Sequence, residues 1–279
     1  MIRLSIVTIS FNQVEFLDDC LESVMSQMRD DVEYIVVDPG STDGSRERIQ
    51  SYGTAITPVF EQDEGPADGL NKGFERATGD YFYFLNSDDV LMPGAIDAMM
   101  TAIHDHDGTD VFCFGGYLVD RKLRRLRLMR SFRFSAQRFS RGNTSIFQQG
   151  LLFSSRKFRE VSGFNKSNRT CWDAELAVDI SLSGATFVDR PERIAYFRIY
   201  DTSITGSASN YVENRENKDR LYKRTFGRRP NWVARLVYKM VKFEKYLYPT
   251  YLFATVALRS ANLTRAVFRR NADRPAFPK

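Results

Sequence analysis

Histidine and cysteine are scarce in this sequence of 279 residues, which contains two histidines and three cysteines. The histidines, His104 and His106, lie in one short segment, so the sequence argues against a histidine-rich metal site and against a Ser-His-Asp triad. The cysteines are far apart and stand within apolar patterns. This is typical of reduced core residues, not of a disulfide framework or a zinc site.

Long apolar runs are also missing. No stretch of about 18 apolar residues occurs, which is the length that a membrane-spanning helix needs. The chain opens on a β-branched run and lacks the basic segment and apolar core of a signal peptide. The sequence therefore predicts a cytoplasmic protein without a membrane-spanning helix.

Charge is unevenly distributed along the chain. Residues 218–279 carry 16 Lys and Arg against 3 Asp and Glu, a net charge of +13. Residues 1–217 carry 24 against 32, a net charge of −8. We therefore predict two parts, an α/β catalytic domain over 1–217 and a basic helical extension over 218–279.

Short apolar runs alternate with segments of helical periodicity, which predicts a mostly parallel, doubly wound α/β sheet flanked by helices. Asn12 is the predicted N-cap of the first helix, and Gly79 is the predicted left-handed residue that ends the helix containing Leu70 and Phe74. The predicted strands are 4–9, 34–37, 59–60, 81–85, 111–119, 125–128, 146–153 and 194–200.

Acidic residues follow two of these strands directly. Asp38 follows the second strand, and Asn86-Ser-Asp-Asp89 follows the strand over 81–85. Ligands of open α/β sheets bind at the carboxyl ends of the strands. Two adjacent acids there are costly to bury unless a cation faces them, and Mg²⁺ or Mn²⁺ holding a diphosphate fits that requirement. A turn followed by a helix cap explains the same tetrapeptide without any ligand.

Four segments in this order resemble glycosyltransferase family 2, and the similarity extends from about residue 2 to about residue 205. They are SIVTISFN at 5–12, VVDPGSTDGS at 36–45, DGLNKG at 68–73 and LNSDD at 85–89. The resemblance implies a GT-A fold and transfer of a sugar with inversion at its anomeric carbon. It also implies a nucleotide-sugar donor, and a glycan or lipid-linked acceptor as in bacterial surface polysaccharide synthesis.

The resemblance also implies roles for individual acidic residues. Asp38 matches the residue that holds the nucleotide base and ribose, although Pro39 replaces the second acid that the family often has there. Asp88 matches the ribose-side member of the DxD-like motif, and Asp89 matches the ligand of Mn²⁺ or Mg²⁺. Asp68 matches a position beneath the diphosphate.

Two further positions come from the same comparison with the family. Lys72 supplies charge to phosphate in one interpretation and is a solvated helix lysine in the other. Asp173 matches the acid at the start of a helix that acts as catalytic base, whereas Glu175 points elsewhere on that helix. Without the family pattern, Asp173 is favourable charge at a helix N-terminus. Gln148 stands where the family often has histidine.

The basic extension contains an amphipathic helix. Trp232, Leu236 and Met240 share one predicted face, with lysine and arginine opposite. This pattern fits a helix in an anionic membrane interface, at the cytoplasmic face of the inner membrane, or a helix that packs on the catalytic domain or on a second subunit.

Two other functions fit parts of the sequence. One is a nucleotide-sugar-binding or scaffold protein without catalysis, which the presence of both Asp89 and Asp173 argues against. The other is nucleic-acid binding, suggested by the basic tail. The acidic N-terminal part and the lack of a nucleic-acid motif argue against that function.

Overall fold

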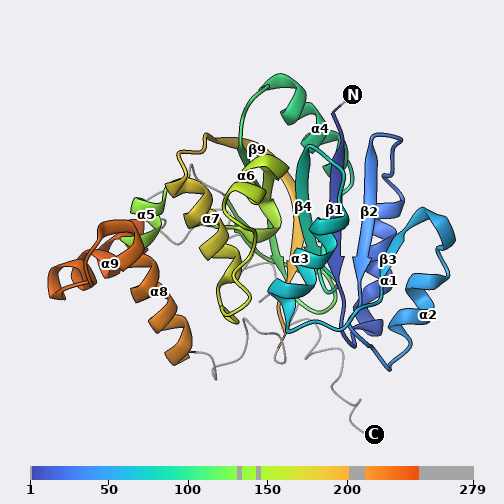
Figure 1. The fold of residues 1–279 in the computed structure, drawn as a ribbon, viewed down its shortest axis with the longest axis horizontal. Coiled ribbons are helices and arrows are strands. Elements are labelled where there is room, and N and C mark those ends of the chain that lie inside the picture. The colour runs from blue at the N-terminus through green and yellow to red at the C-terminus, as the bar shows by residue number, and fades with distance from the viewer. Residues whose placement is uncertain (1, 131–133, 143–145, 201–210, 245–279) are drawn as a thin grey trace, which may run out of the picture.

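The computed structural model describes residues 2–130, 134–142, 146–200 and 211–244, and within these ranges one nine-stranded mixed sheet runs through the molecule (Figure 1). Its strand order is β3-β2-β1-β4-β8-β6-β9-β5, with β7 paired to β6. The strands are β1 (Leu4–Ile9), β2 (Val32–Val37), β3 (Thr57–Val59), β4 (Tyr81–Asn86), β5 (Val90–Leu91), β6 (Val111–Val119), β7 (Arg125–Met129), β8 (Leu151–Ser154) and β9 (Phe187–Arg198).

The first four strands are parallel, as the alternating sequence pattern predicts. Ile9 at the end of β1 is level with Val37 of β2 and with Asn86 of β4, so these strands end at one edge. The other half of the sheet is mixed, because β8 is antiparallel to both of its neighbours, whereas β6 and β9 are parallel to each other. The predicted α/β sheet flanked by helices is confirmed.

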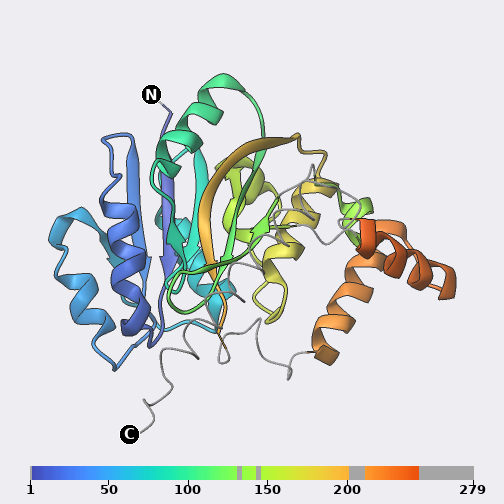
Figure 2. The same ribbon diagram turned by 180° about the vertical axis from the view of Figure 1, so that it is seen from behind.

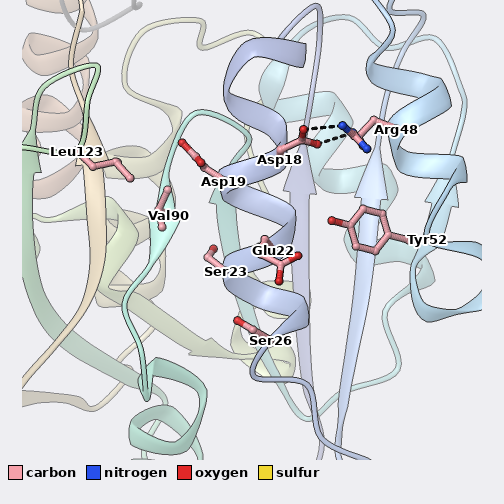
Figure 3. Close-up of a pocket in the computed structure, with 9 residues that line it drawn as sticks. All are labelled: Asp18, Asp19, Glu22, Ser23, Ser26, Arg48, Tyr52, Val90 and Leu123. Carbon is pink, nitrogen blue, oxygen red and sulfur yellow. Dashed lines mark hydrogen bonds and ion pairs between the residues drawn. The ribbon is translucent and has the colours of Figure 1, made fainter.

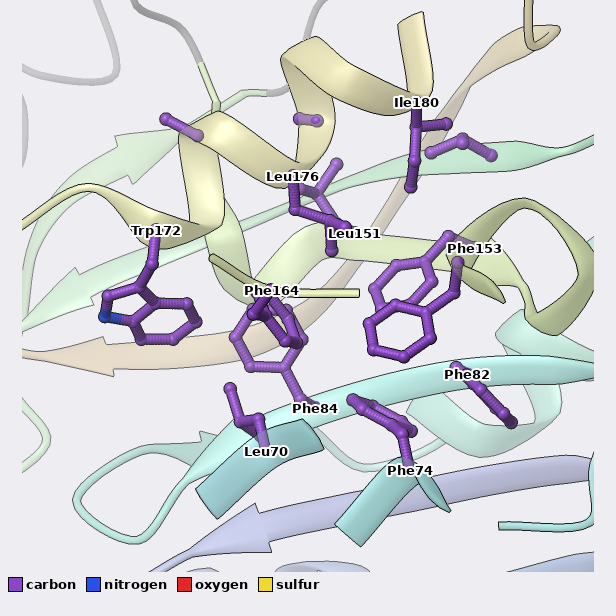
Figure 4. Packing of buried hydrophobic residues seen from close by; sticks show 14 of the residues in the cluster. Leu70, Phe74, Phe82, Phe84, Leu151, Phe153, Phe164, Trp172, Leu176 and Ile180 are labelled. Atoms are coloured by element: carbon purple, nitrogen blue, oxygen red, sulfur yellow. The ribbon is translucent and has the colours of Figure 1, made fainter. Parts of the chain in front are cut away.

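Helices cover both faces of the sheet (Figures 1 and 2). On one face, aromatic side chains from α3, β4, β8 and α7 form a continuous core in which Phe74 stacks on Phe82 at 4.6 Å (Figure 4). On the other face, α1 and α4 bury leucine, isoleucine and methionine. The helices of the catalytic part are α1 (Val14–Met25), α2 (Ser45–Gln50), α3 (Pro66–Arg76), α4 (Ala95–Asp105), α5 (Ala136–Ser140), α6 (Ser155–Glu160) and α7 (Trp172–Leu182).

Helix α3 has glycine at two positions, Gly69 and Gly73, where an added side chain would meet neighbouring residues. A Cβ atom at Gly73 would lie 2.5 Å from Val7 Cγ1 and 3.0 Å from Val37 Cγ2. A Cβ atom at Gly69 would lie 2.6 Å from Asp63 Oδ2. A larger residue at Gly73 would therefore meet β1 and β2, whereas a larger residue at Gly69 would first meet the Asp63 side chain.

Three local predictions were wrong. Asn12 is not the N-cap of α1; it has a positive φ of 51° and its side chain accepts a hydrogen bond from Thr42 N, while Gln13 precedes the helix. Gly79 does not have a left-handed conformation. It is needed because a Cβ atom there would lie 2.4 Å from Ser5 Oγ. The predicted strand over 146–153 begins too early: Gln148–Gly150 is a 3₁₀ turn, and only its last three residues belong to a strand, β8.

The C-terminal described region consists of α8 (Tyr211–Phe226) and α9 (Trp232–Glu244). The predicted boundary between residues 217 and 218 lies inside α8, which packs on α5 and α7. Arg220 and Arg224 of α8 are ion-paired with Glu175 of α7. In the described part of the chain, no helix is long and apolar enough to cross a membrane.

Candidate active site

The carboxyl ends of β1, β2 and β4 form a polar edge of the sheet. Ser10 N donates to Val37 O, Asp38 N to Val59 O, and Ser87 N to Ile9 O, so the chain segments that leave these strands stay hydrogen-bonded to their neighbours. The predicted site residues Asp38, Asp88 and Asp89 are thereby brought to the same edge. This is where open α/β sheets bind ligands.

Asp38 is fully buried, and only one of its two carboxylate oxygens has hydrogen-bond partners among the described residues. Its Oδ1 accepts hydrogen bonds from Gly40 N, Ser41 N and Arg46 Nε at 2.9, 2.8 and 3.0 Å. Its Oδ2 is buried and lacks a hydrogen-bond partner among the described residues. A buried acceptor without a donor costs about 1–3 kcal/mol, so this oxygen is suited to a donor group that a ligand supplies.

Asp89 is fully buried and held by the protein on both oxygens. Oδ1 accepts from Arg198 N at 2.9 Å, and Oδ2 accepts from Gln149 Nε2 at 2.6 Å and from Asn86 Nδ2 at 3.3 Å. Burial raises the pKa of Asp89 well above its usual value, and the neighbouring charge of Asp88 raises it further. The charged form of Asp89 is therefore disfavoured in this site, and a nearby cation would favour it.

Asp88 is the more accessible of the two acids. Its Oδ2 accepts a hydrogen bond from Tyr200 Oη at 3.0 Å. Burial raises the pKa of Asp88, while the Tyr200 hydrogen bond and the charge of Arg198 oppose the shift. Among the described residues, no group of three or more His, Cys, Asp or Glu side chains is arranged to hold a metal ion. The described side chains by themselves therefore do not make up a complete set of metal ligands.

Asp68 and Lys72 are both engaged with the protein. The Lys72 ammonium lies 3.3 Å from Asp68 Oδ2 and also donates to the Gln62 carbonyl. Lys166 lies 3.0 Å from Asp68 Oδ1, and the backbone N–H of Glu64 donates to Oδ2. Asp68 therefore fastens the loop that precedes α3.

Asp173 and Glu175 have different environments, although both lie in the first turn of α7. Asp173 is half-buried, and burial raises its pKa, while the Ala174 N–H and the charge of Lys218 act in the opposite direction. The neighbouring Trp172 ring lies 5.5 Å from that of Phe84, which places the start of α7 beside β4. Asp173 is thus a carboxylate whose pKa is raised by burial, in the first turn of a helix that packs beside β4.

Glu175 is buried and fully paired. Both of its oxygens accept from Arg220, and Asn165 and Asn168 also donate to it. Burial tends to raise the pKa of Glu175, but the hydrogen bonds from Arg220, Asn168 and Asn165 outweigh it, so the pKa is lowered. The sequence predicts that Asp173 and Glu175 point in different directions. In the structure their surroundings differ, because Glu175 is paired with Arg220 and the pKa values of the two acids are shifted in opposite directions.

The sequence patterns did not predict several polar residues that contact the acids at this edge. Gln149 and Arg198 hold Asp89, Arg46 holds Asp38, and Tyr200 holds Asp88. The signals in the sequence were the pair Gln148-Gln149 just before an apolar run, and the polar residues Arg198 and Tyr200 at the end of the strand predicted over 194–200. The Gln148 side chain also lies here, and its Nε2 is buried without a hydrogen-bond partner among the described residues.

A groove of about 530 Å³ lies elsewhere, on the outer side of α1 (Figure 3). Asp18, Asp19 and Glu22 line it, with Arg48 and Tyr52 of the α2 region at one side. This acidic lining is unsuited to a diphosphate. The groove is connected to the polar edge through Asp19, whose carboxylate pairs with the buried Arg198 at 2.8 Å.

The profile of glycosyltransferase family 2 matches residues 5–161, which is more than half of the chain. The chain belongs to glycosyltransferase family 2. It is therefore a transferase, and the matched segment contains the polar edge at β1, β2 and β4 as well as Gln149.

Relatives in sequence are glycosyltransferases by name. An uncharacterized glycosyltransferase of Rickettsia typhi is 26% identical over 219 residues, which cover 76% of this chain and 69% of the relative. The putative teichuronic acid biosynthesis glycosyltransferase TuaG of Bacillus subtilis is 34% identical over 117 residues, which cover 40% of this chain and 46% of TuaG.

Solved structures confirm the GT-A fold. S. aureus TarS 1–349 in complex with UDP-GlcNAc superposes with a TM-score of 0.67 at 14% identity, covering 88% of this chain and 73% of TarS 1–349. The mannosyltransferase PcManGT from Pyrobaculum calidifontis, in complex with GDP-Man and Mn²⁺, superposes with a TM-score of 0.60 at 16% identity, covering 95% of this chain and 75% of PcManGT.

Proposed function

We propose that this glycosyltransferase moves a sugar from a nucleotide-sugar donor to a hydroxyl of a glycan or lipid-linked acceptor, with inversion, in bacterial surface polysaccharide synthesis. The observation that carries the proposal is the buried, unpaired Oδ2 of Asp38 at the same sheet edge as the acidic pair Asp88 and Asp89. The names of TuaG and the TarS ligand support a polymer acceptor and a nucleotide-sugar donor.

Asp38 would bind the nucleoside part of the donor. Its free oxygen can accept one hydrogen bond from the base or ribose, while Gly40, Ser41 and Arg46 hold the other oxygen in place. Arg46 is itself positioned over the Phe60 ring, 4.9 Å from its centroid. The carboxylate therefore loses little conformational freedom when a donor binds.

Asp173 would act as general base. A sugar hydroxyl is a poor nucleophile until a carboxylate accepts its proton as the C–O bond forms. Burial raises the pKa of Asp173, which strengthens it as a proton acceptor. Glu175 is unsuited to this role because Arg220 and two asparagines occupy its oxygens.

The acidic pair would hold Mn²⁺ or Mg²⁺, which when bound neutralises charge that develops on the leaving diphosphate. We assign the direct ligand to Asp88 and not, as the sequence suggested, to Asp89. Asp89 is fully buried and accepts from Arg198 N, Gln149 and Asn86, whereas Asp88 is partly exposed. In this assignment Asp89 fixes the end of β4. Asp68 and Lys72 would stabilise the loop beneath the diphosphate.

The test is incubation with a panel of UDP- and GDP-sugars and Mn²⁺, measuring release of the nucleoside diphosphate. We expect release with one donor, and we expect Asp173→Asn to bind that donor but to turn it over far more slowly. Donor binding without turnover in the unmodified protein would support a nucleotide-sugar-binding protein instead. Absence of both binding and turnover would remove the donor-site assignment.

A further inference from the structure

Helix α9 presents an apolar face to solvent. Among the described residues, seven large apolar side chains are exposed, and four of them lie in α9. Trp232 is 77% exposed, Met240 65%, Leu236 50% and Val233 43%. Residues 232, 236 and 240 follow each other at a spacing of four, so they form one stripe along the helix. Single exposed apolar residues are ordinary, but a continuous stripe marks an interaction surface.

The opposite side of α9 rests on the catalytic part of the protein. Ala234, Val237 and Tyr238 are half-buried. A Cβ atom at Gly142 would lie 2.4 Å from the Tyr238 carbonyl oxygen, so the end of α5 contacts the helix backbone directly. Figures 1 and 2 both show α9 at the extreme end of the molecule, beyond α5 and α8. The apolar stripe therefore faces away from the protein that supports the helix.

Positive charge accompanies this face. Arg228 and Arg229 are exposed in the turn immediately before α9. Arg235 is exposed on the flank of the stripe, where it forms an ion pair of 2.9 Å with Asp219. Tryptophan beside aliphatic residues, with arginine at the margin, is the arrangement of a helix that lies in a membrane interface.

We propose that the α9 face, defined as Trp232, Val233, Leu236 and Met240 with the flanking Arg228, Arg229 and Arg235, binds a membrane surface that contains anionic lipid. Each arginine near such a surface contributes about 1 kcal/mol, which corresponds to about a fivefold increase in partitioning. The apolar side chains enter the boundary between headgroups and acyl chains, where partial burial of one leucine or methionine gives about a 10-fold increase.

A second copy of the chain fits this face less well. Four apolar side chains are far fewer than the roughly 20–30 residues per partner that a stable protein interface contains. A symmetric dimer would also place two copies of the same positively charged face in one interface, and like charges oppose such association. The charge of the face is complementary to an anionic surface and not to itself.

The experiment uses the full chain and vesicles of phosphatidylcholine, with and without phosphatidylglycerol. The sequence has two tryptophans, and Trp172 is buried, so a change in fluorescence on adding vesicles reports on Trp232. We expect a blue shift and co-sedimentation with the phosphatidylglycerol vesicles at low salt, and release as salt is raised. Vesicles of phosphatidylcholine alone should bind much more weakly.

Substitutions separate the two contributions. Leu236→Ser with Met240→Ser should lower partitioning by roughly 100-fold, because two apolar side chains are removed. Arg228→Gln with Arg229→Gln should lower it by roughly 25-fold and reduce the salt dependence. The matched control is Leu182→Ser, which changes an apolar side chain at the end of α7 that is 41% exposed, and it should bind as the unmodified protein does.

Three results would overturn the proposal. The first is that the protein does not bind phosphatidylglycerol vesicles at low salt. The second is that the double variants in and before α9 bind these vesicles as well as the unmodified protein does. The third is a blue shift that appears without vesicles and grows with protein concentration, which would indicate a dimer. Release of nucleoside diphosphate from a soluble donor is measured separately. Failure of vesicle binding with intact donor turnover is thus distinguishable from failure of the proposed chemistry.

Discussion

The phenol of Tyr200 and the carboxylate of Asp88 are joined by a hydrogen bond of 3.0 Å, although 112 residues separate them in the sequence. The Tyr200 ring also lies 4.9 Å from that of Phe16 in α1, and Tyr200 Oη approaches Gln13 Oε1 at 3.4 Å. The residue just beyond β9 thus touches both the first helix and the acid that we assign to the metal. This contact fixes the orientation of Asp88.

Tyr200→Phe should weaken Mn²⁺ binding by about 10-fold, since a hydrogen bond to a charged group contributes about 1.5–3 kcal/mol. The Tyr200 hydrogen bond lowers the pKa of Asp88, against the larger effect of burial, so its loss raises that pKa. A protonated carboxyl does not bind a cation, and the loss of Mn²⁺ binding on acidification should therefore begin at higher pH in the variant.

Calorimetric titration of Mn²⁺ at several pH values measures both effects. Tyr196→Phe is the matched control, because the Tyr196 hydroxyl accepts a hydrogen bond from Arg125 and does not contact Asp88. Equal Mn²⁺ affinity in the two variants would show that Tyr200 does not position the metal ligand.

Asp88→Ala should reduce activity, whereas Asp89→Ala should reduce stability. Asp88→Ala should lose metal-dependent turnover and keep its melting temperature, because it removes a partly exposed carboxylate. Asp89→Ala should unfold at lower temperature, because it leaves the Arg198 N–H and one N–H of the Gln149 amide buried without an acceptor, at about 1–3 kcal/mol each, while the other Gln149 N–H keeps Gln148 Oε1.

Thermal unfolding and Mn²⁺ titration of both variants distinguish the assignments. If Asp89→Ala keeps its melting temperature and loses Mn²⁺ binding, while Asp88→Ala binds Mn²⁺ normally, then Asp89 is the metal ligand that the sequence suggested.

Asp173→Asn should lower kcat by roughly 10²–10⁴-fold, the usual contribution of a positioned general base, and leave donor affinity unchanged. Glu175→Gln should instead lower the free energy of unfolding by on the order of 2 kcal/mol, because Glu175 is buried and holds Arg220 of α8. Steady-state kinetics and denaturant unfolding measure the two quantities. A severe loss of kcat in a fully stable Glu175→Gln protein would identify Glu175 as the base.

The rate should fall on the acid side as Asp173 becomes protonated. Burial raises the pKa of Asp173, so this decline occurs at higher pH than for an ordinary aspartate, and Lys218 opposes the shift. Lys218→Gln removes that opposing charge, so the acid limb of the kcat profile should move to still higher pH. Lys223→Gln, an exposed change on the same helix, should leave the limb in place. A limb that neither Lys218→Gln nor Asp173→Asn alters belongs to another group.

Local patterns allowed the strands and the acids at their ends to be predicted. The run from Tyr81 to Leu85 predicted a buried strand, and β4 has these residues with Asn86 added. The partners of Asp89 were not predictable in this way, because Gln149 and Arg198 come from the 3₁₀ turn before β8 and from β9, 60 and 109 residues further on. Their approach depends on how β8, β6 and β9 are ordered in the sheet, and no local periodicity specifies that order.

The predicted boundary at residues 217 and 218 rests on charge alone, and the structure has a helix across it. The basic composition begins near residue 218, but α8 begins at Tyr211 and is held to α7 by Arg220. Composition records where charges accumulate, whereas the end of a folded unit depends on which of those charges are paired with the core. The predicted extension over 218–279 therefore has its first described turns fastened to the helix that carries Asp173.

Because Gly69 and Gly73 of α3 face close neighbours, a mutation there would change the position of the helix as well as its local packing. At Gly73 even one methyl group would meet Val7 and Val37, so an added side chain displaces the helix as a body. Asp68 and the loop before it would move with the helix, since Asp68 is tied to Glu64 N. Variants with a larger residue at position 73 would then lose donor affinity without any change in the residues that touch the donor.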